Sequence, residues 1–323
     1  MLSRVADSIY WLNRYIERVE NVARFLEVNL NLSLDDSTGL AEQWRPLVTT
    51  TGDLRLYQSL NSDFSGDRVI NFLAFESRYP NSIVSCVKSA RDNARSIRDQ
   101  ISSTMWEQLN DFYLMVSESK EGVSLNDLSE FLDRVKQYSH SFNGVMDATM
   151  SHNEGWYFGC MGRYMERADK TSRILDVKYF QLLPGQEAVG SPIDELGWIA
   201  LLKSASAYEM YRQSLCSAQH RITPAGVAKF LILDDQFPRS IRFCLREAER
   251  SLRRITGNSV GGWKHSSERT LGRLRAELEY KTIDEILQSG LHEFLDGLQH
   301  QMNTVDHEIY ETFFALPPLT AQL

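Results

Sequence analysis

The chain has 323 residues, of which 42% are hydrophobic and 24% charged, and its 43 acidic and 35 basic side chains give a formal net charge of −8. This acidic balance disfavours a general nucleic-acid or anionic-membrane binder, and the low content of eight prolines and eighteen glycines disfavours a loop-rich or all-β chain. Four scattered cysteines without a CxxC pair indicate neither a disulfide framework nor a structural zinc site.

The first predicted element is a long helix, because apolar residues recur at three- and four-residue spacing from Val5 to Leu30. Charges run through this segment, so we do not expect a signal peptide. No apolar stretch approaches the roughly 20 residues of a membrane-spanning helix, and we expect a cytoplasmic protein without membrane contacts. Similar stripes predict further helices over about 82–101, 125–148, 156–182, 194–215, 239–255 and 282–314.

Helix-start signals agree with these stripes. Thr223-Pro224 and Ser191-Pro192 each place an N-cap residue before a proline. Thr282 followed by Glu285 has the spacing of a capping box. Because no segment shows the alternation of a strand, the predicted fold class is all-α.

Four blocks of sequence recur in the same order in the two halves of the chain. We therefore predict a tandem duplication of residues 1–150 and 151–316, with five or six helices in each half and an irregular tail at 317–323. The halves are expected to pack as one two-fold pseudo-symmetric helical bundle. The matching pairs are 14–28 with 163–177, Trp44 and Tyr57 with Trp198 and Tyr211, 69–90 with 227–248, and 128–133 with 291–296.

One repeated motif is charged and has the order Arg-Tyr-apolar-Glu-Arg. On a helical wheel its arginines and glutamate cluster roughly opposite the apolar stripe. The motif is therefore either a solvated face with weak pairs or a polar seam between the halves, which is a buried network or a ligand site. The seam is favoured because both copies keep the same order. Its residues are Arg14, Glu17 and Arg18 in the first half and Arg163, Glu166 and Arg167 in the second.

A second charged feature is a ladder of arginines on the helix predicted after Pro238. Like charges at helical spacing disfavour a helix, so neighbouring groups should offset them. Acidic residues of other helices are the favoured partners, with Glu20, Glu27, Asp169 and Asp176 as candidates. The alternative is an anion-binding stripe for phosphate, carboxylate or an acidic partner. The ladder consists of Arg239, Arg242, Arg246, Arg250 and Arg253.

Several enzymatic motifs are missing from the sequence. There is no HExxH, no Glu-x-x-His and no phosphate-binding glycine motif. Asp234-Asp235 has no third carboxylate at the spacing of magnesium diphosphate enzymes, so we interpret it as a helix-end cap or turn. Cys86 and Cys244 occupy equivalent apolar positions, which predicts buried, inert thiols. We expect no metal and no cofactor.

Three long segments resemble the bacterial alpha-E domain family, an all-helical family of unknown function with a repeated E-R motif. They are MLSRVADSIYWLNRYIERVENVAR at the N-terminus, ARDNARSIRDQISSTMWEQLN at 90–110 and FLILDDQFPRSIRFCLREAERSL at 230–252. Proteins of this family occur beside or fused to a circularly permuted ATP-grasp ligase, often with a transglutaminase-like peptidase. The resemblance therefore implies these two partners and a peptide synthesis or modification system, but no catalytic residues.

Three functions are consistent with the sequence. The first is a non-catalytic accessory protein that binds the ligase, an anionic peptide or acyl intermediate, or both, through arginine-rich faces, with Glu17 and Glu166 orienting the arginines. The candidate arginines are Arg14, Arg18, Arg163, Arg167, Arg239, Arg242 and Arg246. The second is a stand-alone amide-forming or acyl-transfer enzyme with Glu17 or Glu166 as general base. The third is a structural scaffold in which the E-R residues close the seam between the halves.

Overall fold

The computed structural model describes residues 1–35, 40–119, 123, 125–182, 192–215, 222–259 and 261–315. These residues form helices and connecting turns, and no strand is present among them. The first half of the chain contains α1 (Ser3–Asp35), α2 (Leu40–Thr51), α3 (Leu54–Leu60), α4 (Gly66–Ile70), the π-helix η1 (Asn71–Phe75), α5 (Ile83–Ser96), α6 (Ser103–Glu118) and α7 (Leu125–Thr149). The second half contains α8 (Glu154–Leu182), α9 (Pro192–Ser204), α10 (Tyr208–Ser214), α11 (Pro224–Leu233), α12 (Ile241–Thr256), α13 (Ser266–Tyr280), α14 (Ile283–Gln288), α15 (Leu291–Ile309) and the π-helix η2 (Tyr310–Phe314).

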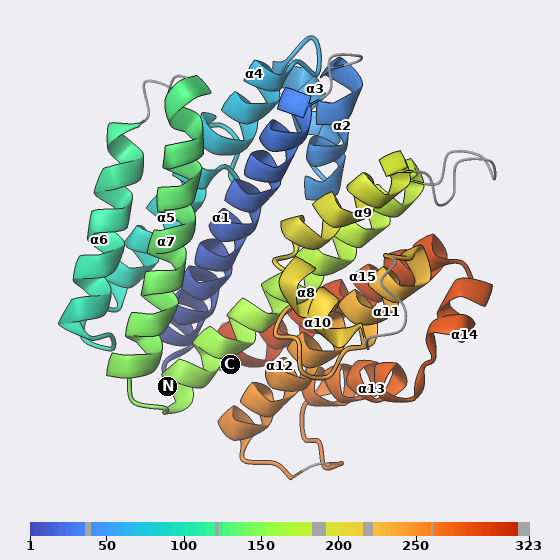
Figure 1. Ribbon diagram of the computed structural model, residues 1–323. Coiled ribbons are helices and arrows are strands. Elements are labelled where there is room, and N and C mark those ends of the chain that lie inside the picture. The colour runs from blue at the N-terminus through green and yellow to red at the C-terminus, as the bar shows by residue number, and fades with distance from the viewer. Residues whose placement is uncertain are drawn as a thin grey trace.

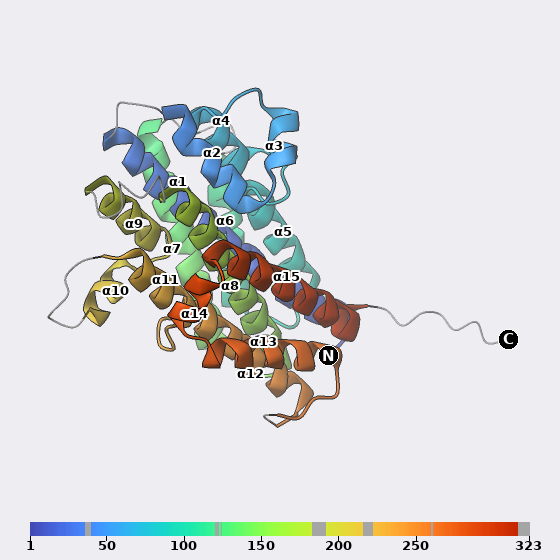
Figure 2. The ribbon, with the colours of Figure 1, turned by 90° about the vertical axis from the view of Figure 1, so that its right-hand side faces the viewer.

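Two long helices, α1 and α8, form the centre of the molecule. They pack against each other, and each is flanked by helices of its own half of the chain: α5 and α7 lie against α1, and α12 and α15 lie against α8 (Figures 1 and 2). The short helices α2, α3 and α4 gather at one end of α1 (Figure 1). Any side chain on the facing sides of α1 and α8 is therefore covered from several directions.

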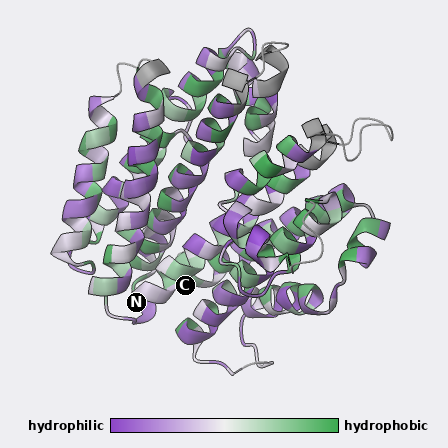
Figure 3. Ribbon diagram, viewed as in Figure 1, coloured by the Kyte–Doolittle hydropathy of each residue, from purple (hydrophilic) through white to green (hydrophobic). Residues whose placement is uncertain are grey.

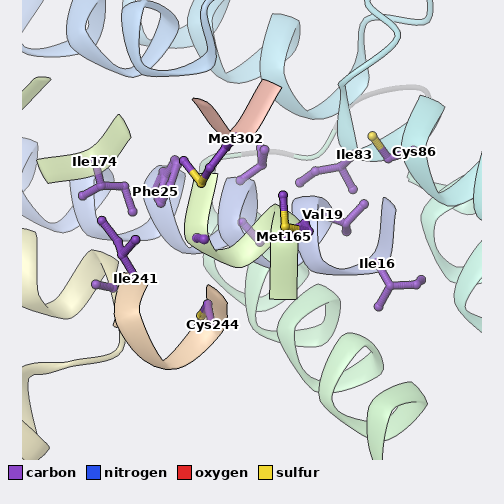
Figure 4. Packing of buried hydrophobic residues seen from close by; sticks show 14 of the residues in the cluster. Ile16, Val19, Phe25, Ile83, Cys86, Met165, Ile174, Ile241, Cys244 and Met302 are labelled. Carbon is purple, nitrogen blue, oxygen red and sulfur yellow. The ribbon is translucent and has the colours of Figure 1, made fainter. Parts of the chain in front are cut away.

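The buried apolar residues form a continuous cluster that draws on both halves of the chain. Ile16 and Val19 from α1, Met165 from α8, Ile83 from α5 and Ile241 from α12 belong to it and lie close together (Figure 4). Most helices alternate between hydrophilic and hydrophobic residues along their length, as expected of helices with one exposed and one buried face (Figure 3). The hydrophobic effect thus binds the two halves into one core. None of the described helices combines the length and apolar character needed to cross a bilayer.

Glycine allows α1 and α8 to approach closely. A Cβ atom built on Gly162 of α8 would overlap the backbone carbonyl oxygen of Tyr10 on α1. Small residues at a helix crossing let the two backbones come together, and the longer side chains interlock on either side. The crossing point lies within one turn of the E-R motif in both helices.

The helix starts follow the capping signals in the sequence. The Thr223 hydroxyl accepts a hydrogen bond from the Gly226 N–H at the start of α11, and Thr282 and Glu285 form a capping box at the start of α14. Ser82 and Ser240 cap α5 and α12 in the same way. The start predicted at Ser191 lies outside the described residues, as does the tail at 317–323.

Two predicted helices are interrupted. The stripe over 194–215 is divided between α9 and α10 because Ser206 adopts a left-handed conformation with φ of 51°. The stripe over 282–314 is divided between α14 and α15 by Gly290, which has φ of 87°. The expectation of five or six helices per half is wrong, because seven α-helices in the first half and eight in the second lie in the described ranges, several of them a few turns long.

Candidate functional site

The E-R motifs of α1 and α8 meet at the helix crossing and pair reciprocally. Glu17 of α1 accepts two hydrogen bonds from Arg167 of α8, at 2.8 Å from Nε and 2.7 Å from Nη2. Glu166 of α8 accepts two from Arg18 of α1, at 2.6 Å from Nε and 2.9 Å from Nη2. Each pair is a bidentate carboxylate–guanidinium contact, which is the strongest geometry available to these groups.

Further cations surround each glutamate. The Nη1 of Arg239 lies 2.8 Å from Oε1 of Glu17, and the Nε of Arg14 lies 2.9 Å from Oε2 of Glu166. The ammonium group of Lys170, one turn along α8, is 3.5 Å from Glu166. Asn21, one turn along α1, donates to Glu17 at 3.2 Å. We call Arg14, Glu17, Arg18, Glu166, Arg167, Lys170 and Arg239 the Glu–Arg network.

Burial of this network is nearly complete. The exposed fraction is 1% for Glu17, 0% for Glu166 and 9% or less for Arg14 and Arg239. The interpretation of the motif as a solvated face is therefore wrong. The helical wheel separates the polar from the apolar residues of α1 correctly. The polar side is nevertheless buried, because α8 covers it.

Electrostatics keep both glutamates charged. Burial alone would raise the pKa of Glu17, but Arg167 and Arg239 more than offset this and hold the pKa well below its usual value. Burial has the same effect on Glu166, and Arg18, Lys170 and Arg14 hold its pKa well below the usual range. Buried charges of this kind persist only when they are paired and hydrogen-bonded, which both glutamates are.

A second layer of charges continues the network along both helices. On α1, Glu20 accepts a 2.5 Å hydrogen bond from Arg239, contacts Arg24 and lies 3.1 Å from the Nε2 of His140. On α8, Asp169 pairs with Lys170 and Arg173. Burial, with the positive charge of Arg239, lowers the pKa of Arg24 to about 10. The spacing of four residues in Glu20–Arg24 and Asp169–Arg173 is the signal in the sequence for these pairs.

The far end of the chain also enters the network, which the sequence did not indicate. Asp306 of α15 accepts a 2.7 Å hydrogen bond from Nη1 of Arg14 and another of 2.7 Å from the Tyr10 hydroxyl. The guanidinium of Arg14 also lies 4.9 Å from the centre of the Trp11 ring. Arg14 is thus held between α1, α8 and α15.

The three remaining predicted site residues lie outside the Glu–Arg network. Arg163, the counterpart of Arg14, donates to Asn143 at 3.3 Å and lies 3.8 Å from the half-exposed Asp147. Arg242 faces Glu279 at 3.8 Å, and Arg246 faces Glu247 at 3.3 Å. These arginines do not meet Glu17 or Glu166.

The prediction for the arginine ladder needs correction. Arg239 does not belong to a helix face, because it precedes Ser240, the N-cap of α12, and the turn directs it towards α1. It pairs with Glu20, as expected. The other proposed partners are engaged elsewhere: Glu27 with Lys136, Asp169 with Lys170 and Arg173, and Asp176 with His292.

The remaining chemistry of the site is limited. Cys86 and Cys244 are buried beside the network, as predicted, and burial raises the pKa of each thiol to about 12. Asp234 ends α11 and accepts hydrogen bonds from the Gln236 and Phe237 N–H groups, which confirms the interpretation as a cap. Within the described ranges, no three His, Cys, Asp or Glu residues are placed to hold a metal ion.

The fold and the site define an all-helical protein centred on a buried E-R motif. Residues 1–314 match the family model Alpha-E, described as a predicted alpha-helical domain with a conserved ER motif, and the chain belongs to this family. Similar proteins from Mycobacterium bovis and two strains of Mycobacterium tuberculosis, all described as uncharacterized, are 24% identical to it over 341 aligned residues. The alignment covers 97% of this chain, which spans 37% of the length of these relatives. No solved structure matches the chain.

Proposed function

We propose that this protein is a non-catalytic, cytoplasmic accessory protein of an ATP-grasp-type peptide synthesis or modification system. The observation that carries this proposal is the mutual pairing of the E-R motifs, in which Glu17 and Glu166 are buried and satisfied by arginines of the opposite helix. A network closed in this way fixes the positions of α1 and α8. The flanking helices are then presented to a partner as one rigid surface.

We also propose that residues 1–150 and 151–316 arose by tandem duplication and pack about an approximate two-fold axis. The reciprocal Arg18–Glu166 and Arg167–Glu17 pairs support this relation. So do the matching positions of Ser82 and Ser240, which cap α5 and α12. The two halves differ where Lys170 replaces Asn21 and Arg239 replaces Asn81, so equivalent sites carry different charges.

The proposed partners are a circularly permuted ATP-grasp ligase and a transglutaminase-like peptidase, together with an acidic peptide that the protein binds. ATP-grasp ligases join a carboxylate to an amine through an acyl-phosphate. The support for these partners is the resemblance to the alpha-E family. The relatives extend far beyond the matched region, which agrees with a helical unit that works beside other domains.

The alternative of a stand-alone acyl-transfer enzyme has less support. A general base needs a pKa near the working pH and access to the proton that it removes. The pKa of Glu17 and of Glu166 is instead held well below the ordinary value, and both carboxylates are sealed by arginines. The third hypothesis is a structural scaffold in which the E-R residues close the seam between the halves. The proposal keeps this structural role of the E-R residues and adds a partner.

An affinity purification tests the proposal. The tagged protein is recovered from native lysate together with its partners. ATP consumption by the recovered partners is then measured in the presence and in the absence of this protein. We expect an ATP-grasp ligase to be recovered, with ATP turnover that depends on this protein. Formation of an amide product by the purified protein alone, or recovery of no ligase with the folded protein, would overturn the proposal.

A further inference from the structure

A second group of arginines surrounds a cavity of about 570 Å³, away from the Glu–Arg network. The cavity lies between the C-terminal half of α12, the turn at 257–259 and helix α13, which packs against α12 (Figure 1). Its charged lining consists of Arg246, Arg250, Arg253, Arg254, Arg275 and Glu249. We call it the arginine cavity.

A buried carboxylate holds two of these arginines in place. Glu249 is 6% exposed, and its Oε1 accepts hydrogen bonds from Nε and Nη2 of Arg253 at 3.0 and 2.6 Å. Its Oε2 accepts one from Nε of Arg275 at 2.8 Å. Arg253 and Arg275 come from different helices, so Glu249 fixes the distance between two guanidinium groups of the cavity lining.

The other three arginines form a row at four-residue spacing on α12. Arg246 and Arg250 share Glu247, at 3.3 and 3.4 Å. Arg254 is exposed and has no ion pair with any residue that the structure describes. Like charges one turn apart destabilise a helix by a few tenths of a kcal/mol per pair, and an anion between them would remove this repulsion.

We propose that the arginine cavity binds a small molecule that carries two or more phosphate or carboxylate groups. Among the described residues, the five guanidinium groups pair only with the carboxylates of Glu247, Glu249 and Glu279. Since Glu279 also faces Arg242, at least two of the five positive charges lack a counterion there. The planar guanidinium fork matches phosphate and carboxylate oxygens. The volume falls within the range of small-molecule sites, roughly 300–1,000 Å³. This inference does not depend on the proposed accessory function.

Calorimetric titration of the purified protein at near-physiological salt tests the proposal, with inorganic pyrophosphate, citrate and a hexaglutamate peptide as probes. We expect pyrophosphate or citrate to bind and to raise the melting temperature. The double variant Arg250→Gln, Arg254→Gln should weaken this binding at least about tenfold, since two charge-assisted contacts are lost. Both side chains are exposed, so the variant should fold normally.

The matched control is Arg95→Gln with Arg134→Gln, which removes the same charge from exposed positions on α5 and α7. Binding of pyrophosphate and citrate should be unchanged in this control. Equal losses in the two double variants would show a general charge effect and overturn the assignment. So would binding of neither small anion, or a stronger affinity for hexaglutamate than for both, which would assign the surface to an acidic polypeptide.

Discussion

Each glutamate of the E-R motif is a buried anion whose stability depends on the arginines around it. Removing one partner of such a pair leaves the other charge buried and uncompensated, which costs about 3–5 kcal/mol. Glu166 forms ion pairs with both Arg14 and Arg18. Its neighbours therefore lose more than one contact when its charge is removed.

We predict that Glu166→Gln lowers the free energy of unfolding by about 3–5 kcal/mol, as measured by urea denaturation. The control is Asp133→Asn, which removes a half-exposed carboxylate paired with Lys136. Exposed pairs contribute roughly 0–1 kcal/mol, so the control should unfold close to the parent protein. Equal effects of the two substitutions would contradict a structural role for the network.

The same glutamates make stability depend on pH. The pKa of Glu17 and of Glu166 is lower in the folded state than the value of about 4.3 expected in an unfolded chain. Below about pH 5 the unfolded state therefore takes up protons first, and stability falls as the pH falls. We predict a flatter decline between about pH 5 and 3 for Glu17→Gln than for the parent protein in urea titrations. Parallel curves would show that Glu17 does not contribute.

At the scale of helices, the approach of α1 to α8 depends on a missing side chain. Gly162 leaves room for the carbonyl group of Tyr10, whereas Gly144 of α7 has open space where its Cβ would lie. Both glycines are in helices, where alanine is intrinsically favoured by about 0.5–1 kcal/mol. Alanine substitutions at the two positions therefore distinguish the effect of helix propensity on stability from the effect of helix packing.

We predict that Gly162→Ala destabilises the protein by about 1–3 kcal/mol, because the added methyl group forces the helices apart. Gly144→Ala should stabilise it by about 0.5–1 kcal/mol. Thermal unfolding of the two variants measures both effects. A gain of stability in Gly162→Ala would show that the helices can separate without disturbing the Glu–Arg network.

The sequence predicted the positions of the helices better than the contacts between them. Periodicity revealed α1, α5, α7, α8 and α12 because each has a long apolar stripe, and the repeated motif identified Glu17 and Glu166. The break at Ser206 was missed because a left-handed serine leaves no mark in the apolar pattern. Asp306 was missed because it is 292 residues from Arg14, and no local spacing connects them. Arg239 was found, but on a helix face that it does not occupy.

At the scale of the whole molecule, the core and the Glu–Arg network both cross from one half of the chain to the other. The helices α5 and α12 each pack on one member of the α1–α8 pair. A substitution that loosens the crossing of α1 and α8 should therefore destabilise both α5 and α12.

We predict that Glu166→Gln lowers the amide hydrogen-exchange protection of α5 and of α12 by similar factors, because both rest on the same pair of helices. Mass spectrometry of peptic fragments measures the two regions in one experiment. Loss of protection in α12 alone would mean that the two halves open independently. The destabilisation caused by the substitution would then not pass from one half to the other.

The contact between Arg14 and Asp306 has a consequence for biosynthesis. At roughly 5–20 residues per second, about 15–60 s separate the translation of the two residues. During this time α1 can pack against α5 and α7. The side of α1 that faces α8 and α15 stays uncovered until those helices are synthesised. Among the described helices, the longest is thus made before its partners α8 and α15 and is covered last. A nascent chain with such an uncovered face is a natural client for a ribosome-associated chaperone.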